Sequence, residues 1–323
     1  MADTGELHVV ALPEETLEES RRFVADLEAR TKDDPPIASV APARTRELRA
    51  AGLGSFPAPV LLPQAAMRTI LGRSGEIGLR VVAPEAVRGV YLHIHGGGWV
   101  LGSASEQDPM LLELAESVGV AVVSVEYRLA PEHPYPAAVE DCEDAALWLV
   151  EHGAEEFGTQ ALLIGGESAG AHLAVSTLLR LRDRHGRIGD FLGANLSYGV
   201  FDLSLTPSAR RWGTRNLVLS TPTMAWYVEM FLGERRGTAA DPELSPLHAD
   251  LSSMPPALFS VGSEDLLLDD TVLMAACWRE AGNPCRQELY ESAPHGFLRL
   301  PIRLAALARE RQAAFLSDLL REP

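Results

Sequence analysis

The sequence is poor in positive charge. Its 323 residues include 28 Lys and Arg against 45 Asp and Glu, a formal net charge of −17, and only one of those cations, Lys32, is a lysine. Proteins bind nucleic-acid backbones and anionic membrane surfaces through clustered cations, so we expect neither as a partner. The sequence also has no G-x-x-x-x-G-K-[ST] motif, and this argues against a phosphate-binding loop.

Cysteines and long hydrophobic runs are also scarce. Three cysteines, an odd number without metal-site spacing, indicate neither a disulfide framework nor a zinc site, so we expect free, buried thiols at Cys142, Cys277 and Cys285. No segment approaches the roughly 18 apolar residues of a membrane span. The first twelve residues are acidic and lack the basic leader of a signal peptide. These features favour a cytoplasmic protein.

What the sequence does contain is an alternation of strand and helix patterns. A length of 323 residues suggests two domains at about 150 residues each, although α/β folds of this size often form one. Strands that alternate with helices of about 10–15 residues predict βαβ units and a mostly parallel sheet flanked by helices. We expect strands at 66–71, 77–83, 89–94, 120–126, 161–164, 194–198, 257–261 and 286–291. We expect helices at 14–30, 45–51, 106–118, 137–152, 170–183, 268–281 and 303–320.

Two segments depart from this alternation. The strands at 66–71 and 77–83 have only a short connection, so they should pair antiparallel at a sheet edge. Residues 201–237 interrupt the βα rhythm and contain several aromatic residues, which indicates a helical insertion.

The string GESAG at 166–170 lies between an expected strand and an expected helix. It matches G-x-S-x-G, in which a sharp strand-to-helix turn exposes a nucleophilic serine above the sheet. The glycines leave room for neighbouring backbone, and the helix N-terminus favours a developing negative charge. This context predicts Ser168 as a nucleophile.

A second motif, HGGGW at 95–99, directly follows the expected strand 89–94. Consecutive glycines let a loop present backbone N–H groups at close range, as the oxyanion of an acyl-transfer reaction requires. A loop of this type is the usual partner of the G-x-S-x-G turn.

A serine nucleophile needs a base and an orienting carboxylate, which follow it along the chain in this fold. His295, just after the last strand, is the best-placed base. We expect His172 to be structural and His185 to be exposed, and His248 has no strand leading to it. Among the carboxylates, Asp265 follows strand 257–261, at the sheet edge where ligands bind. Its competitors are three nearby acidic residues: Glu264, Asp269 and Asp270.

Together these motifs resemble the hormone-sensitive-lipase family of α/β-hydrolases, from about residue 90 to the C-terminus. The resemblance is carried by HGGGW at 95–99, VEYRLAPE at 125–132, YPAAVED at 135–141, GESAG at 166–170, SEDLL at 263–267 and HGF at 295–297. It implies an α/β-hydrolase fold with a helical cap built from about residues 1–50 and an insertion at about 201–240. The catalytic core would then span about 60–200 and 241–323.

The same resemblance implies a catalytic triad of Ser168, Asp265 and His295. It also implies an oxyanion hole formed by the N–H groups of three residues: Gly97, Gly98 and Ala169. The side chains that we expect in the substrate pocket are Trp99, Tyr198, Leu266 and Phe297. Trp99 could instead pack under the cap, but its place beside the oxyanion loop favours the pocket.

Arg128 and Asp141 have a different expected role, as partners in an ion-pair network that holds the loop after strand 120–126. The function that these features predict is a serine carboxylesterase for short- to medium-chain neutral esters, without metal or cofactor. The alternatives are a non-hydrolytic, dehydratase-like enzyme and a ligand-binding receptor on the same scaffold. Relatives often dimerise, so a homodimer is expected.

Overall fold

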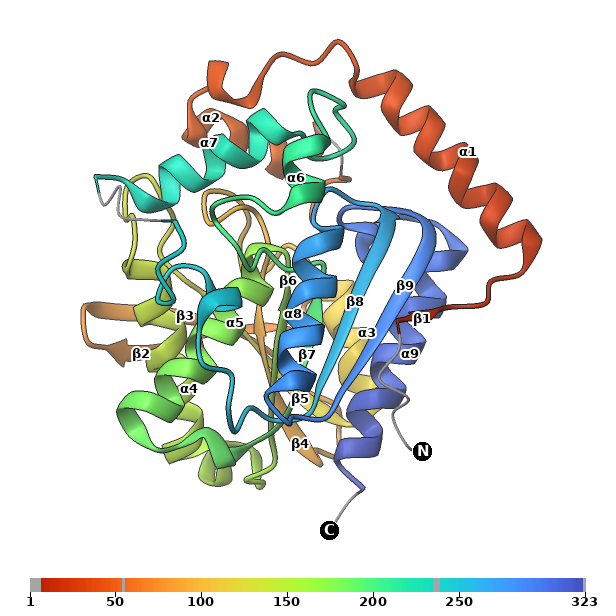
Figure 1. The fold of residues 1–323 in the computed structure, drawn as a ribbon. Helices are drawn as coiled ribbons and strands as arrows, with labels where there is room; N and C mark the ends of the chain where they lie inside the picture. Colours follow the sequence, from red (N-terminus) through yellow and green to blue (C-terminus); the bar gives the residue numbers. More distant parts are fainter. Residues whose placement is uncertain (1–6, 54–55, 235–238, 322–323) are drawn as a thin grey trace.

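A nine-stranded, mostly parallel sheet forms the centre of the computed structural model, which describes residues 7–53, 56–234 and 239–321 (Figure 1). The strand order is β1-β9-β8-β7-β6-β4-β5-β3-β2. Strand β3 pairs antiparallel with both β2 and β5, whereas the other neighbours are parallel. The strands are β1 (His8–Val9), β2 (Ala66–Gly72), β3 (Gly75–Val82), β4 (Gly89–Ile94), β5 (Val120–Glu126), β6 (Leu162–Glu167), β7 (Phe191–Ser197), β8 (Ala257–Glu264) and β9 (Cys285–Pro294).

The eight strands expected from the sequence are present, and so is the antiparallel edge formed by β2 and β3. Strand β1 was not predicted. It has only two residues, too few to show any alternation, and it pairs with β9 at the opposite edge of the sheet. Strand β6 extends to Glu167, three residues beyond its predicted end, so the nucleophile motif starts within the strand.

The helices also follow the predicted pattern, and the expected insertion is helical. They are α1 (Glu14–Thr31), α2 (Pro42–Ala50), α3 (Asp108–Val118), α4 (Ala137–Phe157), α5 (Ala169–Arg180), α6 (Pro207–Arg211), α7 (Thr221–Leu232), α8 (Leu268–Glu280) and α9 (Arg303–Leu319). Helices α3 and α9 contribute to one core cluster, and α4, α5 and α8 to another. The sheet separates these clusters because successive residues of a strand point to opposite faces.

Strand β5 illustrates why both faces are apolar. Val120 and Val122 belong to the cluster with α3 and α9, whereas Val123 and Val125 belong to the cluster with α4 and α5. All four are fully buried. A central strand covered by helices on both sides is apolar on both faces, and β5 is apolar apart from the buried Ser124 and the terminal Glu126.

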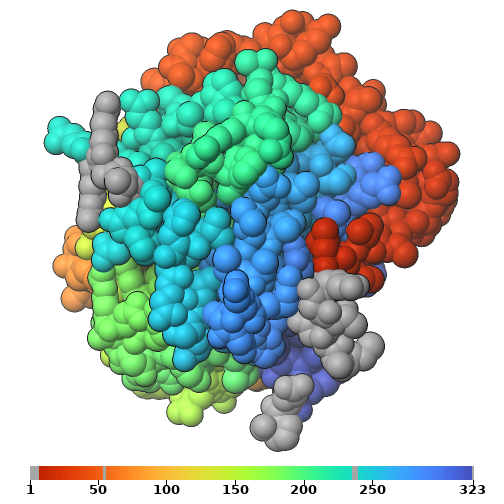
Figure 2. Space-filling view, in the orientation of Figure 1, coloured from red at the N-terminus to blue at the C-terminus, as the bar shows by residue number. Residues whose placement is uncertain are grey.

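Helices α1, α2, α6 and α7 gather at one end of the molecule (Figure 1). The space-filling view shows the N-terminal segment and the insertion in contact there (Figure 2). Leu27 of α1 packs against Leu217 of the insertion, and the Asn216 side chain donates a hydrogen bond to the Thr31 carbonyl at 2.9 Å. Residues 1–6 and 235–238 of the two expected cap segments lie outside the described residues.

Candidate active site

Ser168 stands alone between strand β6 and helix α5, at the tip of a sharp turn. Its φ of 57° and ψ of −120° lie in a region that residues with a side chain seldom adopt. The flanking glycines allow the close packing of this turn. A Cβ on Gly166 would lie 2.1 Å from the carbonyl oxygen of Ile94, and one on Gly170 would lie 1.9 Å from it. This is the geometry of a nucleophile elbow.

The structure brings the three predicted triad residues into one hydrogen-bonded chain. Ser168 Oγ lies 3.0 Å from His295 Nε2, and His295 Nδ1 lies 2.8 Å from Asp265 Oδ2. Asp265 is 2% exposed, and its other oxygen accepts the Leu267 N–H at 2.9 Å. An Nδ1–H bond to the carboxylate leaves Nε2 free to accept the serine proton. The three residues come from the carboxyl ends of β6, β8 and β9, where open α/β sheets bind ligands.

The competing histidines lie elsewhere. His172 is fully buried and hydrogen-bonded through Nε2 to the Leu244 carbonyl at 2.9 Å, as expected for a structural residue. His185 is exposed, as predicted, and its Nε2 lies 2.8 Å from Glu143. Glu143 belongs to α4, 42 residues earlier in the sequence, and the fold brings its carboxylate beside the His185 ring.

The competing carboxylates have other partners as well. Glu264 binds Arg215 at 2.7 Å. Asp269 and Asp270 lie in the first turn of α8, as predicted, and there they accept hydrogen bonds from the start of the insertion. Asp265 therefore has the geometry of the orienting acid.

The oxyanion loop follows β4 and lies next to Ser168. Gly97 and Gly98 have φ values of 128° and 60°, which glycine adopts without strain. A Cβ on Gly97 would lie 2.1 Å from the Leu101 carbonyl oxygen. Ala169 is the first residue of α5, and the first N–H groups of a helix have no acceptor within the helix. The loop and the helix start can therefore supply donors to the same oxygen.

Of the four predicted pocket residues, Tyr198 lines the cavity beside Ser168, edge-on to the His295 ring at a centroid distance of 5.0 Å. Trp99, Leu266 and Phe297 do not line it, so those predictions were wrong. Trp99 turns under α7, where it stacks on Phe231 and donates to His172.

Leu266 and Phe297 are each within two residues of a triad member, yet both point into the core, with exposures of 1% and 0%. The Leu266 carbonyl accepts the Ser208 hydroxyl at 2.7 Å, and the Phe297 ring packs on Tyr198 and Tyr290. Neighbours of a functional residue in a tight loop often point away from it, and sequence proximity does not reveal this.

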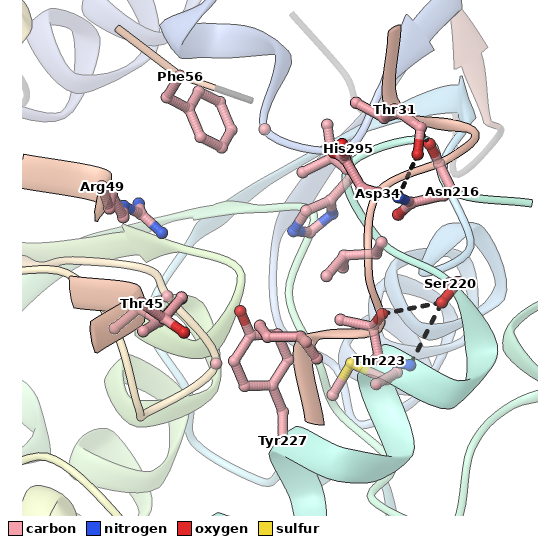
Figure 3. Close-up of a pocket in the computed structure, with 18 of the residues that line it drawn as sticks. Thr31, Asp34, Thr45, Arg49, Phe56, Asn216, Ser220, Thr223, Tyr227 and His295 are labelled. Atoms are coloured by element: carbon pink, nitrogen blue, oxygen red, sulfur yellow. Dashed lines mark hydrogen bonds between the residues drawn. The ribbon is translucent and has the colours of Figure 1, made fainter. Parts of the chain in front are cut away.

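The cavity has a volume of about 810 Å³ and extends from Ser168 and His295 between the N-terminal helices and the insertion (Figure 3). Sequence reasoning missed the side chains that these two segments contribute, because their motifs are too weak to align. The main ones are Leu27, Arg49, Met224 and Tyr227, and the loop after α2 adds Phe56.

A buried polar network behind Ser168 was also missed. Glu167 accepts hydrogen bonds from His93 Nε2 and the Gln107 amide, each at 3.2 Å. Burial alone would raise the pKa of Glu167, but the charge and hydrogen bonding of His93 lower it overall. Burial also lowers the pKa of His95 to about 4, so this residue at the base of the oxyanion loop is neutral near pH 7.

The predicted pair of Arg128 and Asp141 is confirmed. The guanidinium binds both carboxylate oxygens, with Nε–Oδ2 at 2.9 Å and Nη2–Oδ1 at 2.8 Å, and the Arg128 N–H donates to Oδ2. Such two-point contacts fix geometry as well as charge, and here they tie the loop after β5 to α4.

Cys142 and Cys285 are buried and Cys277 is partly buried, all as free thiols. In the described part of the chain, no group of three or more His, Cys, Asp or Glu side chains could hold a metal ion. No helix within the described residues is long and apolar enough to cross a membrane.

The sheet, the elbow and the Ser–His–Asp chain define the class of the α/β-hydrolases. The model of a family described as "alpha/beta hydrolase fold" matches residues 91–299, and the chain belongs to this family. The predicted resemblance to hormone-sensitive lipases is also confirmed. A hormone-sensitive lipase from a metagenome library is similar over 93% of this chain and 98% of its own, with 25% identity and a TM-score of 0.81.

Other similar proteins are named esterases. "Carboxylesterase NlhH" of Mycobacterium tuberculosis is 33% identical over 83% of this chain and 85% of its own length. "Carboxylic ester hydrolase LipN" of the same species is 32% identical over 76% and 67%. The solved esterase from the archaeon Pyrobaculum calidifontis is 31% identical over 93% of this chain and 97% of its own, with a TM-score of 0.83.

Proposed function

We propose that this protein, a carboxylic ester hydrolase, cleaves short- to medium-chain neutral esters through a covalent acyl-serine intermediate. The observation that carries the proposal is the Ser168–His295–Asp265 chain, with contacts of 3.0 and 2.8 Å at the floor of a large cavity. No second function has a specific observation in its favour.

In the proposed reaction, His295 Nε2 takes the proton of Ser168 as Oγ attacks the ester carbonyl carbon. The N–H groups of Gly97, Gly98 and Ala169 stabilise the resulting oxyanion. The C–O bond to the alcohol breaks, and His295 returns the proton to the leaving oxygen. Water that His295 activates then attacks the acyl-enzyme, and this releases the acid and restores Ser168. Throughout, Asp265 orients the imidazole and stabilises its cationic form.

The substrate class is argued from the cavity and the charge of the chain. About 810 Å³ accommodates a small ester, and a net charge of −17 gives no long-range attraction for polyanions. Relatives named "Acetyl esterase" from Salmonella, 29% identical over 69% of this chain, support a short acyl group.

The proposal includes a cap. We take residues 1–50 and 201–240 as the cap, with the catalytic core at 60–200 and 241–323 in one domain. The cavity supports this division because its walls contain residues from both segments, such as Leu48 and Met224, whereas its floor contains Ser168 and Gly97. A homodimer stays a prediction.

An acyl-chain series of p-nitrophenyl esters, from acetate to dodecanoate, tests the proposal. We expect kcat/KM to peak at short to medium chains. Ser168→Ala should lose several orders of magnitude of that activity, whereas Ser252→Ala, at an exposed serine, should retain it. An unchanged rate in Ser168→Ala would refute the mechanism, and activity confined to long chains would refute the substrate class.

A further inference from the structure

Tyr227 on α7 presents a hydroxyl group to the cavity. Its ring packs against the oxyanion loop, since a Cβ on Gly98 would lie 2.3 Å from the ring atom Cδ1. The residue is 6% exposed, and burial raises the pKa of the phenol to about 12, so the group keeps its proton at neutral pH. Figure 3 shows the hydroxyl pointing into the cavity. Among the described residues it has no hydrogen-bond partner, so it is available to a group bound in the cavity.

Arg49 on α2 presents a second donor in the same part of the cavity (Figure 3). Its Nε and Nη2 both contact Glu106 Oε2, at 3.0 and 2.9 Å, and its guanidinium lies 5.5 Å from the centre of the Phe56 ring. Within the described chain, Nη1 makes no hydrogen bond. Arg49 and Tyr227 both line this cavity, and Figure 3 shows their polar ends facing the same space.

Four polar side chains on the opposite side of the cavity already have partners. The Thr31 hydroxyl donates to backbone carbonyls, one of them that of Leu27, and the Asn216 amide donates to the Thr31 carbonyl. Ser220 accepts the Thr223 N–H at the start of α7, and their hydroxyls are 2.8 Å apart. These four side chains are therefore already engaged, and the other donors next to Thr31, namely Arg30 and Lys32, are solvent-exposed, unlike the Tyr227 hydroxyl.

The positive and negative side chains next to Tyr227 and Arg49 are equal in number. Arg299 shares Glu106 with Arg49, at 3.2 Å, and its side chain is 15% exposed. Glu167, which also lines the cavity, supplies a second carboxylate. Two guanidinium groups thus face two carboxylates beside Tyr227, whereas Arg30, Lys32 and Asp34 line the cavity near Thr31. An uncharged oxygen satisfies both donors without placing another negative charge near Glu106 and Glu167.

We propose that Tyr227 and Arg49 form a subsite for a second, uncharged oxygen of the substrate, separate from the oxygens of the ester that is cleaved. The preferred substrates are then neutral esters that carry an ether, carbonyl or hydroxyl oxygen elsewhere. This inference rests on the proposed function and narrows its substrate class. Tyr227 and Arg49 act here as specificity residues that bind the substrate away from the reacting bond.

Matched ester pairs test the subsite. In the acyl half, p-nitrophenyl 4-methoxybutanoate is compared with p-nitrophenyl hexanoate, and in the alcohol half, 2-methoxyethyl butanoate with butyl butanoate. We expect Tyr227→Phe to lower kcat/KM for the methoxy ester of at least one pair by about 3- to 10-fold, mainly through KM, as the loss of one neutral hydrogen bond predicts. Its effect on the all-carbon partner should stay below about twofold, and Arg49→Gln should show the same selectivity.

Two control variants carry the same kinds of substitution at positions outside the cavity. Tyr290→Phe removes another buried phenol hydroxyl, which donates to Glu288 and lies outside the cavity, and Arg44→Gln removes an exposed charge from α2. Neither should alter the ratio of methoxy to all-carbon rates. A third pair, ethyl hydrogen adipate and its neutral amide analogue, tests charge, and the wild-type enzyme should prefer the amide.

Equal loss for both members of every pair would assign Tyr227 to the oxyanion or to stability and overturn the subsite. An unchanged ratio in Tyr227→Phe and Arg49→Gln, or a preference for the adipate carboxylate, would overturn it as well. These outcomes leave the esterase proposal intact. A wild-type protein that hydrolyses none of the esters overturns the proposed function, and the subsite with it.

Discussion

Two adjacent acidic residues show how position assigns a role to a side chain. Asp265 is buried and faces His295, whereas Glu264 points outward to Arg215, which also binds Glu28 of α1 at 2.9 Å. Both follow the same predicted strand, so the strand pattern does not separate them, and the resemblance of SEDLL at 263–267 to a known family was what implied Asp265. The direction of each side chain is set by the end of β8, which the sequence does not specify.

The pair also provides a matched experiment. We expect Asp265→Asn to lower kcat roughly 10³- to 10⁴-fold, because an amide no longer holds the imidazole in the required tautomer. Glu264→Gln should stay within about tenfold of the wild type, since it removes only a partly exposed ion pair. The measurement is steady-state hydrolysis of p-nitrophenyl butanoate. A larger loss in Glu264→Gln than in Asp265→Asn would reverse the assignment.

Gly97 offers a second prediction at this scale. In Gly97→Ala the new Cβ would lie 2.1 Å from the Leu101 carbonyl oxygen, and φ would remain near 128°, so the oxyanion loop has to move. Loss of one oxyanion donor typically lowers kcat by about 10²- to 10³-fold, and we expect a loss of that order.

Gly158→Ala is the control, because it has a φ of 73° but no atom within 4 Å of the new Cβ. It should cost only about 1 kcal/mol of stability and leave kcat unchanged. Thermal unfolding and ester hydrolysis, measured on both variants, separate strain from catalysis. Wild-type kcat in Gly97→Ala would exclude the loop from the oxyanion hole.

At the scale of elements, the strands and helices of the core followed from the sequence because each is long and strongly patterned. The walls of the cavity did not. Helices α1 and α7 bury side chains against each other's segments and against the core, so their apolar faces do not reveal which residues reach the ligand. Met224 and Tyr227 lie three residues apart on α7 and both line the cavity, a result of how the helix docks.

His172 joins α5 to two turns, those of Trp99 and Leu244, and predicts how stability depends on pH. From α5, its Nδ1 accepts the Trp99 indole N–H at 3.2 Å and its Nε2 donates to the Leu244 carbonyl. Burial lowers the pKa of His172 from 6.5 to about 4. Because the folded-state pKa is below the unfolded value, the stabilisation is complete above pH 6.5 and is lost as the pH falls toward 4.

We therefore expect the free energy of unfolding to fall by about 1–3 kcal/mol between pH 7 and pH 4.5 through this residue. His172→Phe should be less stable at pH 7 but should depend less steeply on pH over that range. Urea unfolding at a series of pH values measures both slopes. An equal slope in the variant would show that His172 is not the titrating group.

At the scale of the whole molecule, we expect the net charge to affect the hydrolysis of anionic esters but not of neutral ones. A charge of −17 repels an anionic ester over distances that salt screens, whereas a neutral ester feels no such force. Between 20 and 500 mM NaCl we expect kcat/KM to change by less than about twofold for butyl butanoate and to rise for ethyl hydrogen adipate. A rate for the adipate ester that falls with salt would indicate a cationic path to the site.

For the whole molecule, the sequence predicted the fold and the order of the triad residues better than it predicted which side chains line the cavity. The alternation of strand and helix patterns predicted the sheet, and six motifs predicted the elbow and the order of Ser168, Asp265 and His295, because that chemistry tolerates few residue types. Residues that only fill space have many equivalents. Its position beside the HGGG glycines therefore predicted Trp99 in the pocket, whereas in the structure the ring packs on Phe231 of α7.

The central claim is that Ser168 carries the acyl group, and rapid-quench mass spectrometry tests it most directly. The enzyme is mixed with p-nitrophenyl butanoate, quenched in acid within milliseconds, and then digested and mapped. We predict one butanoyl group on the peptide that contains Ser168, and none in Ser168→Ala under the same conditions. A butanoyl group on a different residue, or hydrolysis at the wild-type rate by Ser168→Ala, would contradict the account.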